Sequence, residues 1–195
     1  MVSITVIISA HPARFASYLP RALMSVCAQT LQPKTVVVAT DLAREGAAAT
    51  KNRALRMVDT EWTAVLDSDD QFMACHLEKL AKAQSGSGAD VVYSWPAMDC
   101  AEGATDPVPE MFGVPFSGEE LRKRPYVHTA VLMRTRLALE AGGFQCRMGE
   151  SWDDYGLWLA MLDAGAVFHH HPERTWIWTI HGQNTSGQPH RGDAA

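Results

Sequence analysis

The sequence predicts an α/β fold, a single Rossmann-like domain whose mostly parallel, twisted sheet carries helices on both faces. Two observations predict it: β-branched runs that suit buried strands, and segments of helical period that alternate with those runs in the first half of the chain. Parallel neighbours need a crossover, which is usually a helix. The chain has 195 residues, enough for one domain with a sizeable core, which we expect over 1–186 with a polar tail over 187–195.

The elements of the first half follow one another in strict alternation. The first strand is expected at the β-branched run 4–8. A helix follows, because apolar residues recur at helical spacing from 19 to 27 and Pro20 lies near the first helical position. The alternation continues with a strand at 36–39, a helix at 46–58, a strand at 62–66 and a helix at 76–84.

The second half is less regular. Four prolines and three glycines interrupt residues 96–118, which predicts a loop. At the end of this loop, Ser117 and Glu120 fit a capping box that opens a short helix. The remaining expected elements are strands at 90–95, 128–133, 166–171 and 175–181, and helices at 134–141 and 153–164.

Composition and charge argue against several classes of protein. A net charge of −5 and a pI near 5.9 argue against a phosphate backbone or an anionic membrane as partner, so we expect no nucleic-acid binding. No apolar run approaches the roughly 20 residues of a membrane span, and no basic segment precedes the first apolar stretch, so no transmembrane segment and no export are expected. The four cysteines form no CxxC pair, which indicates reduced, buried thiols. We therefore expect a cytoplasmic protein.

The strongest local signal is a cluster of three carboxylates, Asp67, Asp69 and Asp70, directly after a buried strand. Without compensation these groups repel one another and raise each other's pKa. A divalent cation removes that cost, and oxygen ligands suit Mg²⁺ or Mn²⁺. The alternative is a solvated acidic turn that caps the following helix. An EF-hand is excluded, because Gln71 and Phe72 stand where its loop needs an oxygen ligand and a glycine.

Three groups of polar residues follow predicted strands. Ligands of open α/β sheets bind beyond the carboxyl ends of the strands, so 9–11, Asp41 and 67–69 should line one crevice. The chain has neither a GxGxxG loop nor a GxxxxGK[ST] loop there, which argues against a dinucleotide dehydrogenase and a P-loop NTPase.

Taken in order, the segments "RALMSVCAQTLQP", "LDSDD" and "GGF" followed by "WDDYGLWL" resemble the family 2 inverting glycosyltransferases of the A-type fold. The resemblance covers roughly residues 2 to 186, nearly the whole chain. It implies a metal-dependent enzyme that transfers a sugar, with inversion, from a nucleoside-diphosphate sugar to an acceptor hydroxyl. UDP is the nucleotide that the resemblance favours, and Mn²⁺ or Mg²⁺ the metal.

The resemblance also implies which residues bind the donor. Ser9 and His11 match the end of the family's first strand, where the nucleotide base lies, although the proline-threonine-tyrosine-asparagine type of sequence common there is absent. Asp41 matches the acid that contacts a uracil-like ring, with an ordinary turn aspartate as the alternative. Lys51 stands at an arginine position and offers a point charge rather than a fork, with a solvated helix face as the alternative. Asp67 matches the first acid of the DxD motif and implies a sugar or ribose contact.

The same resemblance assigns the metal and the catalytic base. Asp69 is the direct metal ligand, with Asp67 as a further candidate. His181 matches a late histidine that approaches the metal or the diphosphate, with an ordinary loop histidine as the alternative. Asp154 is the base that takes the proton of the acceptor. Asp153 replaces the family's glutamate, and the shorter side chain leaves open which of the pair reaches the acceptor; two acids favourably placed at a helix N-terminus are the alternative.

Two rival functions are weighed against this interpretation. A non-catalytic protein that binds a nucleotide sugar or a metal would need the donor crevice but not a base, so the pair Asp153 and Asp154 argues against it. A sugar-1-phosphate nucleotidyltransferase would need a glycine-rich, basic loop after the first strand. Residues 10–16 offer only Arg14.

Overall fold

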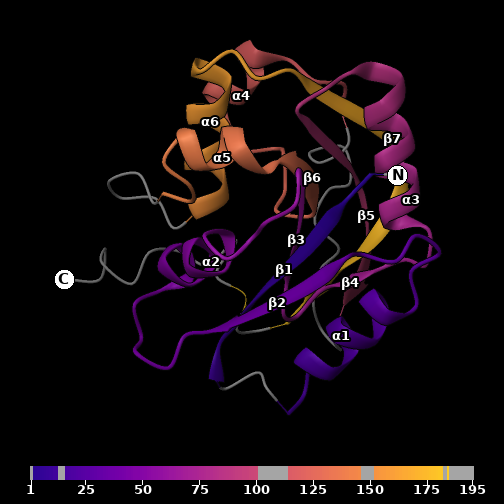
Figure 1. Ribbon diagram of the computed structural model, residues 1–195, viewed down its shortest axis with the longest axis vertical. Helices are drawn as coiled ribbons and strands as arrows, with labels where there is room; N and C mark the ends of the chain where they lie inside the picture. Colours follow the sequence, from indigo (N-terminus) through magenta and orange to yellow (C-terminus); the bar gives the residue numbers. More distant parts are fainter. Residues whose placement is uncertain (1, 13–15, 101–113, 146–151, 182–183, 185–195) are drawn as a thin grey trace.

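The computed structural model describes residues 2–12, 16–100, 114–145, 152–181 and 184 (Figure 1). The strands are β1 (Ile4–Ala10), β2 (Thr35–Thr40), β3 (Trp62–Asp67), β4 (Gln71–Phe72), β5 (Val91–Cys100), β6 (Val131–Arg134) and β7 (Phe168–Ile180). The helices are α1 (Leu19–Cys27), α2 (Ala47–Leu55), α3 (His76–Ser87), α4 (Gly118–Lys123), α5 (Thr135–Glu140) and α6 (Asp153–Asp163).

The strands form one mixed sheet in the order β2-β1-β3-β6-β5-β7-β4. β1 pairs in parallel with β2 and β3, and β5 pairs in parallel with β7. β6 runs antiparallel to both β3 and β5, and β4 runs antiparallel to β7. All the strands except β6 and β4 therefore point the same way, and the expected α/β fold with a mostly parallel sheet is confirmed.

Two hydrophobic clusters cover the two faces of the sheet, because successive side chains of a buried strand point to opposite faces. Ile4, Val6 and Ile8 of β1 pack in one cluster with residues of α1 and α3. Ile7 of the same strand packs in the other cluster with residues of α2, α4, α5 and α6. The helices thus lie on both faces, as the alternating pattern predicted (Figure 1).

The structure differs from the expected elements mainly in β5 and β7. β5 continues through Pro96 to Cys100, where a loop was expected, and β7 is one strand where two were expected. The pairing between them shifts register at Ser94/Trp95 and at Trp95/Pro96. Extra residues of β7 around Pro172 fill these bulges, so the strand continues across a proline that locally resembles a break.

Smaller features follow their local chemistry. The Ser117 side chain accepts a hydrogen bond from the backbone N–H of Glu120 at 3.3 Å, so the expected cap of α4 is confirmed. α3 extends beyond residue 84 to Ser87 and is followed by Gly88, whose φ of +70° is the left-handed conformation that glycine adopts most readily. Cys27 and Cys75 are free, but Cys27 is exposed, contrary to the expected burial.

Among the described residues, no helix has the length and apolar character needed to cross a membrane.

Candidate functional site

The site begins where β1 and β3 end side by side. Ser9 is the register partner of Asp67 in the parallel pairing of β1 with β3. The Ser9 hydroxyl donates to Asp67 Oδ1 at 3.0 Å. Two of the residues expected to line the crevice are therefore in direct contact at the carboxyl ends of the strands.

Lys51 reaches this pair from α2. Its Nζ lies 3.2 Å from Asp67 Oδ1 and 3.2 Å from Asp153 Oδ1, and its side chain is only 3% exposed. The alternative of a solvated helix face is therefore wrong for Lys51. Burial lowers the pKa of Lys51, but the carboxylates of Asp153, Asp67 and Asp154 outweigh burial and hold that pKa above its ordinary value. The lysine is thus a permanent buried cation between two acids.

Asp153 and Asp154 open α6 and point to different partners. Asp153 Oδ1 accepts from Lys51, whereas its Oδ2 is buried without a hydrogen-bond partner among the described residues. Asp154 Oδ2 accepts from the Thr129 hydroxyl at 2.9 Å, and its Oδ1 accepts from the backbone N–H of Tyr155 at 2.8 Å. Burial raises the pKa of both carboxyls, and Lys51 opposes that rise. The two acids therefore differ in surroundings although they are neighbours in sequence.

A clamp from α2 holds the segment that precedes α6. Asn52 donates to the carbonyl of Phe144 and accepts from its backbone N–H, both at 2.8 Å. A Cβ on Gly143 would lie 2.2 Å from the Asn52 side-chain oxygen, and the φ of Gly143 is +75°, so this contact requires glycine. Gly156 of α6 is equally confined, since a Cβ there would lie 2.0 Å from the backbone oxygen of Gln145. Gly156 is thus a packing requirement of this chain.

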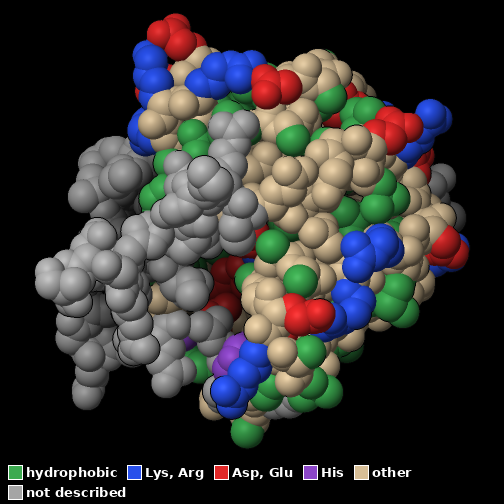
Figure 2. Space-filling model, turned by 90° about the vertical axis from the view of Figure 1, so that its left-hand side faces the viewer, with side chains coloured by type: hydrophobic (Ala, Val, Ile, Leu, Met, Phe, Trp, Pro, Cys, Tyr) green, Lys and Arg blue, Asp and Glu red, His purple; other side chains and the backbone are tan. Residues whose placement is uncertain are grey.

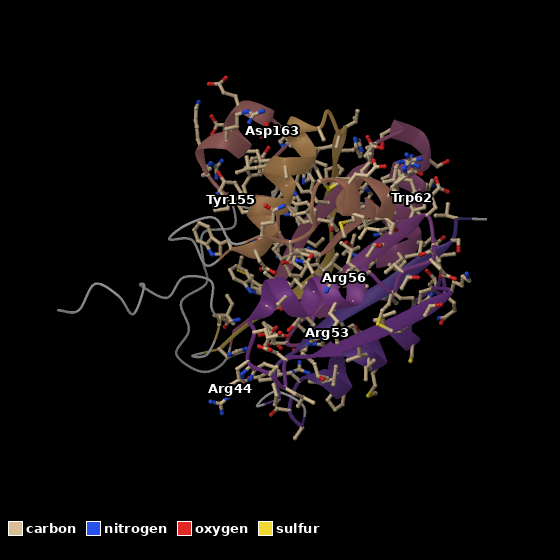
Figure 3. All side chains as sticks on the ribbon, turned by 60° about the vertical axis from the view of Figure 1, so that its left-hand side comes forward. Arg44, Arg53, Arg56, Trp62, Tyr155 and Asp163 are labelled. Carbon is tan, nitrogen blue, oxygen red and sulfur yellow. The ribbon has the colours of Figure 1, made fainter. Side chains whose placement is uncertain are left out.

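In Figure 3, Arg53 marks α2 and Tyr155 marks the start of α6, and the two helices lie side by side over the sheet. Lys51 and Asn52 belong to the same helix as Arg53, so one short helix contacts both the end of β3 and the beginning of α6. Sequence reasoning assigned Lys51 to the donor but gave no role to Asn52 or Thr129. Both act on residues that are distant in sequence, Phe144 and Asp154.

A second pair joins the end of β3 to the end of β7. His181 Nε2 lies 3.0 Å from Asp69 Oδ2, and both side chains are 7% exposed. The Tyr18 ring stacks on His181 with centroids 4.8 Å apart. Asp70 accepts from the backbone N–H of Thr179 at 2.9 Å, which fastens the acidic turn to β7. Burial and the neighbouring Asp69 and Asp67 raise the pKa of Asp70 well above its usual range.

This pair fits part of a divalent-cation site. Asp69 and Asp70 are buried, so the alternative of a solvated acidic turn is wrong. Asp69 and His181 supply one carboxylate oxygen and one imidazole nitrogen, a donor set that suits Mn²⁺. Among the described residues no three histidine, cysteine or acidic side chains converge on one point. On the face in Figure 2, acidic side chains lie inside a recess with a histidine beside it.

Two expected donor residues lie apart from these contacts. Asp41 accepts from the backbone N–H groups of Glu45 and Gly46 at 2.8 and 3.0 Å, so both of its carboxylate oxygens order the turn into α2. His11 is exposed just beyond the end of β1. Asp41 therefore has the geometry of an ordinary turn aspartate, which was the alternative for this residue. The contact of Asp41 or His11 with a nucleotide base stays a prediction.

The family follows from the sequence match. The model of Glycosyl transferase family 2 matches residues 41–139, just over half of the chain. The chain belongs to glycosyl transferase family 2. The family expected from the sequence motifs is therefore confirmed. Asp153, Asp154 and His181 of this family 2 chain lie outside the matched residues. A comparison with curated proteins gave no match.

Solved structures of TarS from S. aureus resemble the family 2 chain in fold. TarS 1–349 in complex with UDP-GlcNAc superposes with a TM-score of 0.72 at 18% identity, over 94% of this chain and 60% of that one. TarS 1–349 in complex with UDP gives a TM-score of 0.67 at 19% identity, over 92% of this chain and 61% of that one. The glycosyltransferase A-type fold is thereby confirmed. The chain spans about three fifths of the TarS fragment that it matches.

Proposed function

We propose that the chain is a glycosyltransferase that moves a sugar from a UDP-sugar to a hydroxyl acceptor, with inversion at the anomeric carbon. The observation that carries the proposal is the Lys51 bridge between Asp67, at the end of β3, and Asp153, at the start of α6. A protein that only bound a nucleotide would need the first of these acids. The bridge brings the neighbouring acids Asp153 and Asp154 close to Asp67, as a two-substrate reaction needs.

The donor is proposed to lie over the ends of β1, β2 and β3. Ser9, His11, Asp41, Lys51 and Asp67 are the candidate contacts. TarS, which shares the fold, has been solved with UDP and with UDP-GlcNAc, and this favours a uridine nucleotide. Lys51 already has two carboxylate partners, so we expect it to act on the donor mainly by holding Asp67 in place.

Asp154 is proposed as the base. The acceptor proton moves to the Asp154 carboxylate, the acceptor oxygen bonds to the anomeric carbon, and the bond from that carbon to the diphosphate breaks, so UDP leaves with the electron pair. One displacement inverts the anomeric carbon. Asp153 is less suited to the task, because the Lys51 ammonium stabilises its ionised form directly at 3.2 Å. The hydrogen-bond donors on Asp154 are neutral.

A divalent cation completes the proposed donor site. Asp69 and His181, with Asp67 close by in sequence, are the residues that would hold Mn²⁺ or Mg²⁺. When bound, such an ion neutralises charge on the diphosphate leaving group. Five acids surround Lys51 and His181 in this region, Asp67, Asp69, Asp70, Asp153 and Asp154, and this excess of negative charge favours a cation.

The test is a panel of nucleotide sugars with Mn²⁺, with release of the nucleoside diphosphate as the signal. Asp154→Asn keeps the shape of the side chain but cannot take the proton. We expect kcat to fall by about 10²–10⁴, the usual contribution of a general base, while KM for the donor stays nearly constant. Asp163→Asn, at the exposed end of the same helix, is the matched control and should keep full activity.

Three outcomes would contradict the proposal. Near wild-type turnover by Asp154→Asn would show that Asp154 is not the base. A larger loss of kcat in Asp153→Asn would assign that role to Asp153. Binding of UDP-sugars by the wild-type chain without turnover of any of them would favour the non-catalytic binding protein instead.

A further inference from the structure

Thr129 precedes β6 and lies near the carboxyl end of β3, where the proposed site is located. β6 runs antiparallel to β3, with Ala64 paired to Leu132, so the residues that precede β6 lie near the end of β3. The carbonyl of Thr129 accepts from the backbone N–H of Val131 at 2.8 Å, and the residue is only 7% exposed. A β-branched side chain has a stiff χ1 angle, so the hydroxyl is held in one place.

The two oxygens of Asp154 have partners of different kinds. Oδ1 accepts from a main-chain N–H, that of Tyr155, which can only donate. Oδ2 accepts from the Thr129 hydroxyl, which can turn and accept once Oδ2 carries a proton. Protonation at Oδ1 would lose a hydrogen bond, whereas protonation at Oδ2 exchanges one hydrogen bond for another.

We propose that Thr129 is a positioning residue that selects Oδ2 of Asp154 as the oxygen that takes the acceptor proton. This inference rests on the proposed function, because it needs Asp154 to act as a base. Thr129 orients the carboxylate before the reaction and accepts from the protonated carboxyl after it. Its own hydroxyl gains and loses no proton overall.

The inference is tested by removing the hydroxyl while keeping the volume of the side chain. In Thr129→Val we expect kcat for UDP release from the best UDP-sugar, with water as the acceptor, to fall about 10- to 100-fold, the effect of one hydrogen bond to a charged group. KM for the donor should stay constant, since the hydrogen-bond partner of the hydroxyl within the described part of the chain is Asp154. Thr129→Ser keeps the hydroxyl and should restore most of kcat.

A second readout does not depend on turnover. The Thr129 hydroxyl stabilises the ionised form of Asp154, so its loss should raise the pKa of that carboxyl, measured by ¹³C NMR titration with Asp154→Asn for assignment. The acidic limb of the kcat profile should move to higher pH in parallel. The other titratable groups that face Asp154 are Lys51 on α2, Asp67 on β3 and Asp153 on α6, and they are unchanged in this variant.

The matched control is Thr135→Val at the other end of β6. The Thr135 hydroxyl is buried and paired with that of Thr63 at 2.8 Å, so the change costs stability but should leave kcat and the pKa of Asp154 as in the wild type. If Thr129→Val does not fold, Thr129→Ala removes the same hydroxyl. Wild-type kcat and pKa in Thr129→Val, or an equal loss in Thr129→Ser, would overturn the inference. Wild-type turnover in Asp154→Asn would instead overturn the proposed base.

Discussion

Lys51 is a buried cation whose two partners come from opposite sides of the proposed site. At 3% exposure its charge is compensated chiefly by Asp67 and Asp153, each 3.2 Å away. Removing one member of a buried ion pair destabilises a protein by more than the intact pair stabilises it, because the remaining charge stays buried without compensation. Lys51 therefore determines both the shape and the charge balance of the site.

We expect Lys51→Met to lower the free energy of unfolding by about 3–5 kcal/mol at pH 7, the usual cost of breaking a buried pair. Loss of the cation raises the pKa of Asp153 further above its unfolded value. A carboxyl with a raised folded pKa binds protons more tightly in the native state, so the native state gains stability as pH falls. The deficit should therefore be largest at pH 8 and shrink toward pH 5 in urea unfolding.

The control for this variant is Lys34→Met. Lys34 pairs with Asp59 at 2.9 Å, but both side chains are more than half exposed, 53% and 70%. Exposed pairs contribute little to stability because water screens them, so this variant should unfold almost like the wild type at every pH. An equal loss in the two variants would show that burial of Lys51 has no energetic consequence.

At the scale of elements, the start of α6 is fixed by contacts with the segment before it. The backbone N–H of Gln145 donates to the carbonyl of Asp153 at 3.0 Å, and its carbonyl lies against Gly156. Asn52 fastens the preceding Phe144 to α2. The position of Asp153 and Asp154 therefore depends on a glycine one turn further along the helix.

Glycine in the interior of a helix is normally less favourable than alanine, but Gly156 should show the reverse. We expect Gly156→Ala to destabilise the protein by about 1–3 kcal/mol through overpacking, because its Cβ would lie 2.0 Å from the backbone oxygen of Gln145. It should also lower kcat, since the start of α6 must shift. In the matched variant Gly86→Ala on α3, a Cβ would meet nothing within 4 Å, so a gain of about 0.5–1 kcal/mol is expected. Thermal unfolding of both variants checks the pair, and a gain in Gly156→Ala would contradict the packing argument.

The elements that the sequence predicted best depend on local signals. α1 was expected over 19–27 from apolar spacing and a proline, and the structure has it at Leu19–Cys27. β5 and β7 were misjudged because prolines in them resemble breaks, whereas a bulge in their pairing absorbs the extra residues. The two-residue β4 was missed, since the strand that it pairs with, β7, lies about a hundred residues away in the sequence.

At the scale of the whole molecule, the candidate site combines predictable and unpredictable contacts. Ser9 and Asp67 were expected together because both follow parallel strands, and their register places them side by side. The bridge from Lys51 to Asp153 spans 102 residues and was not foreseen, since each residue was judged from its own surroundings. Such contacts depend on the order of the strands in the sheet, and a local sequence pattern does not indicate that order.

The contact between Asp69 and His181 joins residues 112 positions apart, so a ligand held by both should stabilise the whole fold. With Mn²⁺ and UDP at about 100 times their dissociation constant, linkage predicts a gain of about 2.7 kcal/mol and a rise in Tm of roughly 5–10 °C. Asp69→Asn keeps the shape of the side chain but loses the charge that a hard cation needs. We expect this variant to fold and to lose most of the rise, and His181→Ala to lose part of it. Asp163→Asn, which carries the same change on an exposed aspartate of α6, should keep the full rise. EDTA should abolish the rise in the wild type, because the nucleotide alone would then face the acids of the turn. A full rise in Asp69→Asn, or one that EDTA leaves unchanged, would show that UDP binds without a cation at this pair.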